Sequence, residues 1–280
     1  MKIEITKKTG YLGPEGSNSE VAATSLVQSG KIIPIDTITN IIKKVKDGDL
    51  DSGVVPIENS IQGSVVETVD GLYKNKLFIQ QELIIPIRHC VASLTSKIIP
   101  DKIEMVISHP QALGQCSEYI DKYFPNAKRI TTTSTAEAFK KIAEEGLLNA
   151  VAIGTKVAAD KYKLKILAEN IQDEENNETK FVLIKKIPSR DLKGKISSLI
   201  IIPKKDRSGL LFDILKNFKD NNINLNKIES RPSRLKLGNY IFHIDIEGNF
   251  KDKNVEKAIA GIKKEGEVVF LGSYSTIYFS

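Results

Sequence analysis

The sequence lacks the features that mark disulfide-rich and membrane proteins. Its 280 residues include only two cysteines, which are too few to hold a fold together and which favour a reducing compartment. No apolar run approaches the roughly 20 residues that a bilayer span requires. The first ten residues place isoleucine between charged and polar residues, as in a first strand, and lack the apolar stretch of a signal peptide. We therefore expect a cytoplasmic protein.

Motifs for nucleotides, metals and nucleic acids are also missing. There is no Walker loop, no Gly-x-Gly-x-x-Gly and no Cys-x-x-Cys. The three histidines, His89, His109 and His243, lie far apart and have no carboxylates at metal-site spacing. The net charge of +6 comes from scattered lysines without interleaved aromatics, and tryptophan is absent. We therefore expect no cofactor, no metal and no nucleic-acid partner.

Two sets of alternating strand and helix patterns precede a third set of different order. Up to residue 187, short apolar strands alternate with helical patterns, which is typical of an α/β fold with helices on both faces of parallel sheets. Two such sets predict two lobes with a central cleft. Residues 188–195 have the composition of a linker, and residues 196–280 follow the βαββαβ order of a ferredoxin-like fold. We thus expect a two-lobed domain at 1–187 and a second domain at 196–280.

Polar residues cluster directly after several expected strands, which is where ligands bind in open α/β sheets. Some of them also stand where helices begin, and the free backbone N–H groups there bind carboxylates. Taken alone, each of these residues is better explained as a helix cap or a turn residue than as a site residue. Together they predict a site for an anionic small molecule in the cleft. The clusters are Ser17; Glu58, Asn59 and Ser60; His109 and Gln111; and Ser134 and Thr135.

Five segments, in their family order, make the chain resemble the prephenate dehydratase family. The Pro-Ile-Glu-Asn-Ser run at 56–60 and the His-Pro-Gln-Ala-Leu run at 109–113 are specific signals. The other three lie at 13–17, 134–136 and 177–181, the last reading Asn-Glu-Thr-Lys-Phe. Further along, residues 207–211 and the Glu-Ser-Arg-Pro run at 229–232 resemble the ACT regulatory domain of this family.

The resemblance implies a periplasmic-binding-protein type II-like catalytic fold and an activity in phenylalanine biosynthesis. Prephenate would lose carbon dioxide and water to give phenylpyruvate, and because aromatisation drives the reaction no redox cofactor is needed. Thr179 would donate a hydrogen bond to the leaving hydroxyl, while Glu58 would either orient its neighbours or give a proton. Asn59, Ser60, His109 and Gln111 would orient the ring. The implied substrate-binding residues are Ser17, Ser134, Thr135, Asn177, Lys180 and Phe181.

The ACT resemblance implies feedback inhibition by L-phenylalanine bound between two copies of the domain. It therefore implies a homodimer or a homotetramer. The implied effector-binding residues are Gly209, Leu210, Leu211, Asn224, Glu229, Ser230 and Arg231.

Three places depart from the family pattern, the first being Ser17-Asn18, where the family usually has threonine followed by an aromatic residue. Lys180 replaces the usual arginine and keeps its charge, but lysine lacks the bidentate fork that arginine offers to a carboxylate. Leu210 replaces the usual alanine and adds volume where the effector pocket is expected. Two other functions stay open: arogenate in place of prephenate as substrate, and a non-catalytic amino-acid sensor.

Overall fold

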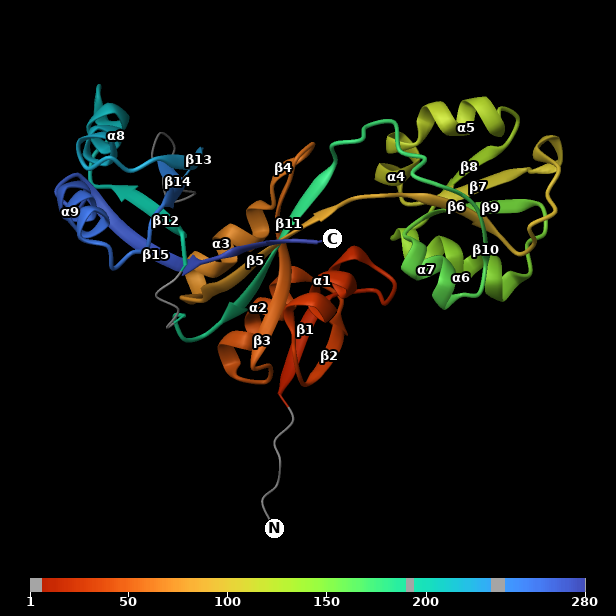
Figure 1. Ribbon diagram of the computed structural model, residues 1–280, viewed down its shortest axis with the longest axis horizontal. Coiled ribbons are helices and arrows are strands. Elements are labelled where there is room, and N and C mark those ends of the chain that lie inside the picture. Colours follow the sequence, from red (N-terminus) through yellow and green to blue (C-terminus); the bar gives the residue numbers. More distant parts are fainter. Residues whose placement is uncertain (1–6, 190–193, 233–239, 280) are drawn as a thin grey trace, which may run out of the picture.

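The computed structural model describes residues 7–189, 194–232 and 240–279, which fold around three β-sheets (Figure 1). The sheet near the N-terminus lies in the middle, with a second lobe on one side and a C-terminal sheet on the other. This α/β architecture confirms the predicted fold class. None of the helices in the described ranges is long and apolar enough to cross a membrane.

The first lobe holds a seven-stranded sheet in the order β16-β5-β11-β3-β1-β2, with β4 beside β3. Strand β1 runs parallel to β2 and β3, whereas β11 runs antiparallel to both β3 and β5. The strands are β1 (Lys8–Leu12), β2 (Lys31–Ile35), β3 (Ser52–Asn59), β4 (Gly63–Ser64), β5 (Phe78–Pro86), β11 (Glu178–Lys185) and β16 (Thr276–Tyr278). The helices are α1 (Asn18–Leu26), α2 (Ile38–Asp47) and α3 (Val66–Asn75).

The second lobe holds a five-stranded sheet in the order β10-β6-β9-β7-β8. The chain enters this lobe between β5 and β6 and leaves it between β10 and β11, so two connections join the lobes. The strands are β6 (Cys90–Ser93), β7 (Met105–Ser108), β8 (Lys128–Thr131), β9 (Ala150–Gly154) and β10 (Lys165–Glu169). The helices are η1 (Pro100–Lys102), α4 (Pro110–Gln115), α5 (Ser117–Tyr123), α6 (Thr135–Glu145) and α7 (Lys156–Lys161).

The third sheet is antiparallel, in the order β13-β14-β12-β15, and follows the predicted βαββαβ order. Its own core packs one face against two helices, with Ile214, Phe218 and Ile259 buried there. Its elements are β12 (Ile196–Pro203), α8 (Leu210–Asp220), β13 (Leu225–Pro232), β14 (Tyr240–Glu247), α9 (Lys253–Ile262) and β15 (Gly266–Tyr274).

Local sequence explains most helix boundaries. In α2 the Thr37 side chain accepts a hydrogen bond from the Asn40 N–H, and Gly48 ends the helix in the left-handed conformation. The apolar residues Ile38, Ile41, Ile42 and Val45 are buried, as their spacing predicts. Residues 110–123 form two helices, because the backbone leaves helical geometry at Cys116.

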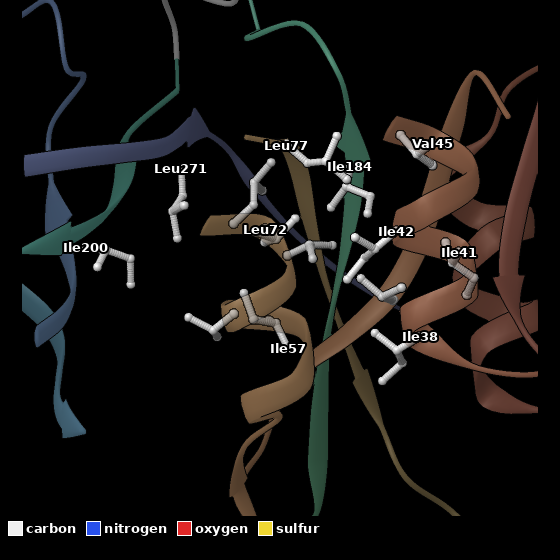
Figure 2. Packing of buried hydrophobic residues seen from close by; sticks show 14 of the residues in the cluster. Ile38, Ile41, Ile42, Val45, Ile57, Leu72, Leu77, Ile184, Ile200 and Leu271 are labelled. Carbon is white, nitrogen blue, oxygen red and sulfur yellow. The ribbon is translucent and has the colours of Figure 1, made fainter. Parts of the chain in front are cut away.

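The third sheet and the first lobe share a hydrophobic core (Figure 2). Ile200 and Leu271 from the third sheet belong to the same buried cluster as Leu72 and Leu77 from the first lobe. After β15 the chain leaves the third sheet, and β16 pairs in parallel with β5 of the first lobe. The third sheet therefore has a core of its own against α8 and α9 and shares a second core with the first lobe. The boundaries at 1–187, 188–195 and 196–280 stay a prediction, and part of the linker lies outside the described residues.

Candidate active site

A cavity of about 270 Å³ lies where the two lobes meet. The first lobe contributes the loop after β1 and the facing ends of β3 and β11, and the second lobe contributes the starts of α4 and α6. Eight of the predicted site residues line it: Ser17, Asn59, His109, Gln111, Ser134, Thr135, Thr179 and Phe181. The sequence clusters thus converge on one cleft.

The lobes also touch beside this cavity. Thr155 Oγ1 in the second lobe donates a hydrogen bond of 2.7 Å to the carbonyl oxygen of Gly16. Gly16 has a φ of +85°, and a Cβ at this position would lie 3.1 Å from the Cβ of Ala158. The turn therefore requires glycine, because any side chain would be strained and crowded there. Lys161 and Glu15 form an ion pair across the same junction.

Asn59 and Thr179 form a fixed pair inside the cavity. They lie directly opposite each other on β3 and β11, and Asn59 Nδ2 donates to Thr179 Oγ1 over 2.9 Å. The Asn59 side-chain oxygen accepts from the backbone N–H groups of Ile61 and Gln62, which fixes the direction in which the amide points. Because Thr179 Oγ1 accepts from Asn59, its own hydrogen is available to another acceptor.

Three predicted site residues act as helix caps and face the cavity as well. Ser17 Oγ accepts from the Glu20 N–H of α1, and Ser134 Oγ accepts from the Glu137 N–H of α6. His109 Nδ1 accepts from the Gln111 N–H, so this nitrogen carries no proton and the other ring nitrogen can donate. These residues therefore cap helices and line the cavity at the same time.

His89 and Gln115 complete the cavity wall and were missing from the predicted site. His89 lies on the first connection between the lobes, and its Nε2 is 3.0 Å from Gln115 Oε1. Burial lowers the pKa of His89 more than its hydrogen bonds raise it, so the ring is neutral. A histidine that follows Arg88 within the mostly apolar run Ile84–Ala92 was the available sequence signal.

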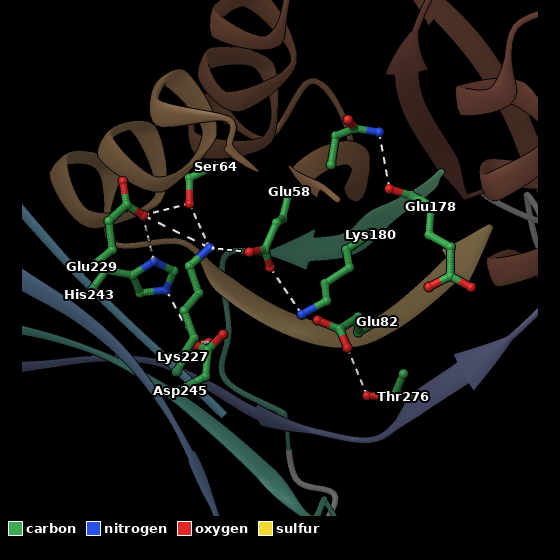
Figure 3. A network of polar contacts seen from close by, with 12 residues as sticks. Glu58, Ser64, Glu82, Glu178, Lys180, Lys227, Glu229, His243, Asp245 and Thr276 are labelled. Carbon is green, nitrogen blue, oxygen red and sulfur yellow. Dashed lines mark hydrogen bonds and ion pairs between the residues drawn. The ribbon is translucent and has the colours of Figure 1, made fainter. Parts of the chain in front are cut away.

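Glu58 and Lys180 are absent from the cavity lining and point to the opposite face of β3 and β11 (Figure 3). Alternation along a strand explains this, because Asn59 and Thr179 face the cavity and their neighbours face away. Lys180 Nζ is 3.0 Å from Glu58 Oε2, and Lys227 Nζ from the third sheet is 3.0 Å from Glu58 Oε1. Burial would raise the pKa of Glu58, but its contacts with both lysines outweigh burial and lower that pKa.

Ser60 and Asn177 lie behind the cavity and tie β3 to the segment before β11. Ser60 Oγ donates to the Asn176 carbonyl oxygen over 3.1 Å and accepts from the Glu178 N–H over 2.9 Å. Asn177 is buried, and its Oδ1 accepts from Asn59 Nδ2 over 2.8 Å. Neither side chain belongs to the cavity lining.

The predicted effector residues are divided between two places. A second cavity of about 170 Å³ in the third sheet is lined by Leu210, Leu211 and Ser230. Gly209 begins α8 beside it with a φ of +78°, a conformation that favours glycine. Asn224 instead donates a hydrogen bond to Glu247 Oε1 over 3.0 Å.

Glu229 and Arg231 lie on the other face of β13 and contact the first lobe. Ser64 Oγ donates to Glu229 Oε2 over 2.5 Å, and Arg231 pairs with Asp70 over 3.0 Å. Ser230 lies between them in the sequence and faces the 170 Å³ cavity. The Glu-Ser-Arg run therefore presents one side chain to the third sheet's cavity and two to the first lobe.

Comparisons with known proteins agree with this architecture. The prephenate dehydratase family profile matches residues 9–189, and the ACT domain profile matches residues 204–263. A prephenate dehydratase from Methanocaldococcus jannaschii is 41% identical over 96% of this chain and 98% of its own length. An arogenate dehydratase from Petunia hybrida is 34% identical over 96% of this chain and 67% of its own length.

A solved structure extends the comparison to three dimensions. The prephenate dehydratase of Arthrobacter aurescens in complex with L-Phe superposes with a TM-score of 0.86 at 30% identity. The match covers 96% of this chain and 90% of that one. The chain therefore belongs to the prephenate dehydratase family, lyases that convert prephenate to phenylpyruvate in phenylalanine biosynthesis, and it carries an ACT domain.

Proposed function

We propose that prephenate is dehydrated in the 270 Å³ cavity and that Thr179 donates a hydrogen bond to the departing hydroxyl. The observation that carries this proposal is the hydrogen bond from Asn59 to Thr179 Oγ1. It leaves the threonine hydrogen free to be donated and holds the oxygen in place before substrate arrives. A donor that is already oriented needs no reorganisation when negative charge develops on the leaving oxygen.

Two helix N-termini support the binding of the two substrate carboxylates. The first turns of α1 and α6 open onto the cavity beside Ser17, Ser134 and Thr135. The positive end of a helix dipole and its free N–H groups favour a carboxylate. No lysine or arginine is among the described lining residues, so hydroxyl, amide and backbone donors would hold these anions.

The reaction requires stabilisation of the negative charge on the leaving oxygen more than it requires a strong acid. The bond to the ring carboxylate breaks, its electrons complete the aromatic ring, and the hydroxyl at the far end of the ring leaves with an electron pair. The hydroxyl of Thr179 is too weak an acid to transfer its proton fully, so it would stabilise the leaving group by hydrogen bonding. The imidazole of His109 and the amide of Gln111 would orient the ring.

We also propose that L-phenylalanine binds in the ACT domain between two copies of the chain. The cavity lined by Leu210, Leu211 and Ser230 and the N-terminus of α8 at Gly209 support an amino-acid ligand. Phe212 is 68% exposed and Tyr240 is 46% exposed, so this side of the domain offers apolar surface to a second copy. A homodimer or homotetramer follows from this arrangement.

Kinetics with two substrates and one variant test the catalytic proposal. Prephenate and arogenate should be supplied separately while phenylpyruvate and phenylalanine are measured, which also decides between the two substrates. Thr179→Val keeps the shape of the side chain and removes the donor, so kcat should fall by about 10²–10⁴-fold with a smaller change in KM. Near-normal turnover by a folded Thr179→Val protein would contradict the proposed role.

A further inference from the structure

The Glu58 carboxylate lies between two ammonium groups from different parts of the chain. Lys180 comes from β11 of the first lobe, whereas Lys227 comes from β13 of the ACT domain (Figure 3). Lys227 is largely buried, with its side chain 11% exposed, and it also donates to Ser64 Oγ over 2.6 Å. A buried ammonium that loses its partner carries a large desolvation cost, so this contact holds its partners firmly.

The Lys180–Glu58 pair is one residue away from the Asn59–Thr179 pair on the same two strands. In the register of β3 and β11, Lys180 lies opposite Glu58 and Thr179 lies opposite Asn59. The first pair faces the ACT domain and the second faces the cavity, because side chains alternate along a strand. The register shifts between Lys180 and Phe181, and such irregularities re-aim the side chains beside them.

We infer that Lys227 of the ACT domain is a positioning residue for the dehydration. By holding Glu58 against Lys180 on the back of the two strands, it fixes their alignment and hence the position of the Thr179 hydroxyl in the cavity. This inference rests on the proposed role of the Asn59–Thr179 pair. It extends the reaction site to a side chain that lines no part of the cavity and comes from another sheet.

Three substitutions at Lys227 and one control test the inference. Lys227→Met should lower kcat by about 2–30-fold, the range for residues that couple sites without contacting ligand, and should change KM by less than about twofold. Lys227→Arg keeps the charge and should retain most of kcat. Lys227→Gln can still donate to Ser64 and should have a kcat similar to that of Lys227→Met. It takes the place of the methionine variant if that variant does not fold. Lys216→Met, in an exposed ion pair on α8, should leave kcat unchanged.

A double-mutant cycle separates positioning from general damage. If Lys227 acts through Glu58, Lys227→Met should lower kcat by less than about twofold once Glu58→Gln is present, because the two residues then no longer interact. An equal fall in kcat with and without Glu58→Gln would overturn the inference. A folded Lys227→Met or Lys227→Gln protein whose kcat equals that of Lys216→Met would also overturn it. So would a folded Lys227→Arg as slow as Lys227→Met. Failure of the catalytic proposal would appear separately, as a normal kcat for Thr179→Val.

Discussion

The core shared by the first lobe and the ACT sheet should make the two unfold together. Leu271 on β15 is 1% exposed and belongs to the buried cluster that includes Leu72 and Leu77 of the first lobe. Leu271→Ala removes three buried carbon atoms and should cost about 2–5 kcal/mol. Because the free energy of unfolding of a domain is about 5–15 kcal/mol, this is a large share of the total.

Urea denaturation followed in two ways measures the effect. With a slope of about 3 kcal/mol per molar urea, a loss of about 3 kcal/mol moves the midpoint down by about 1 M. Far-UV circular dichroism, which reports on all three sheets, and dehydratase activity, which reports on the cleft, should shift together. Leu148→Ala, at a position that is 70% exposed in the second lobe, is the control and should leave both midpoints in place. A shift in the dichroism alone, with the activity midpoint unchanged, would show that the ACT sheet unfolds independently.

Two further predictions concern the ACT domain. We expect saturating L-phenylalanine to weaken substrate binding by about 5–150-fold, and a substrate analogue should weaken L-phenylalanine binding by the same factor. Titration calorimetry of L-phenylalanine with and without the analogue measures this factor. Absence of binding at millimolar L-phenylalanine in an active protein would contradict the prediction. The His243 ring, whose Nδ1 lies 3.9 Å from Glu229 Oε2, together with the Ser64 hydroxyl and nearby cations lowers the pKa of Glu229 from 4.5 to about 2 despite its burial. A carboxyl group whose pKa is lowered in the folded protein stabilises the fold above pH 4.5, and this stabilisation is lost as the pH falls towards 2. The melting temperature should therefore drop more steeply with falling pH in the parent than in Glu229→Gln. Equal slopes of melting temperature against pH for the two proteins would argue against the prediction.

The sequence predicted which side chains gather in the cleft but not which way every one of them points. Asn59 ends β3 and His109 follows β7, and the rule for ligand sites in α/β sheets was enough to bring them together at the cleft. Glu58 and Lys180 belong to the same motifs yet face away. The expectation that Lys180 contacts substrate came from resemblance alone, and residues 178–185 were not recognised as a strand.

The direction of these side chains follows from their alternation between the two faces of that strand. Phe181 and Thr179 are buried while Lys180 is half-exposed, which is the period-two pattern of a strand with two different faces. The same reasoning applies to β13, where Glu229 and Arg231 face the first lobe and Ser230 does not. What no local pattern could reveal is β16, because three residues carry too little signal to show that they pair with a strand almost 200 positions earlier.

Strand β16 also bears on how the newly made chain assembles. Its partner β5 leaves the ribosome long before β16 does, since the whole ACT region lies between them. Until then the outer edge of β5 presents unpaired N–H and C=O groups, and such edges recruit strands from other molecules. Completion of the ACT region therefore covers the open edge of β5 and leaves the three-residue strand β16 as the edge on this side of the catalytic sheet. A chain interrupted within that region would keep the edge open and be prone to aggregate.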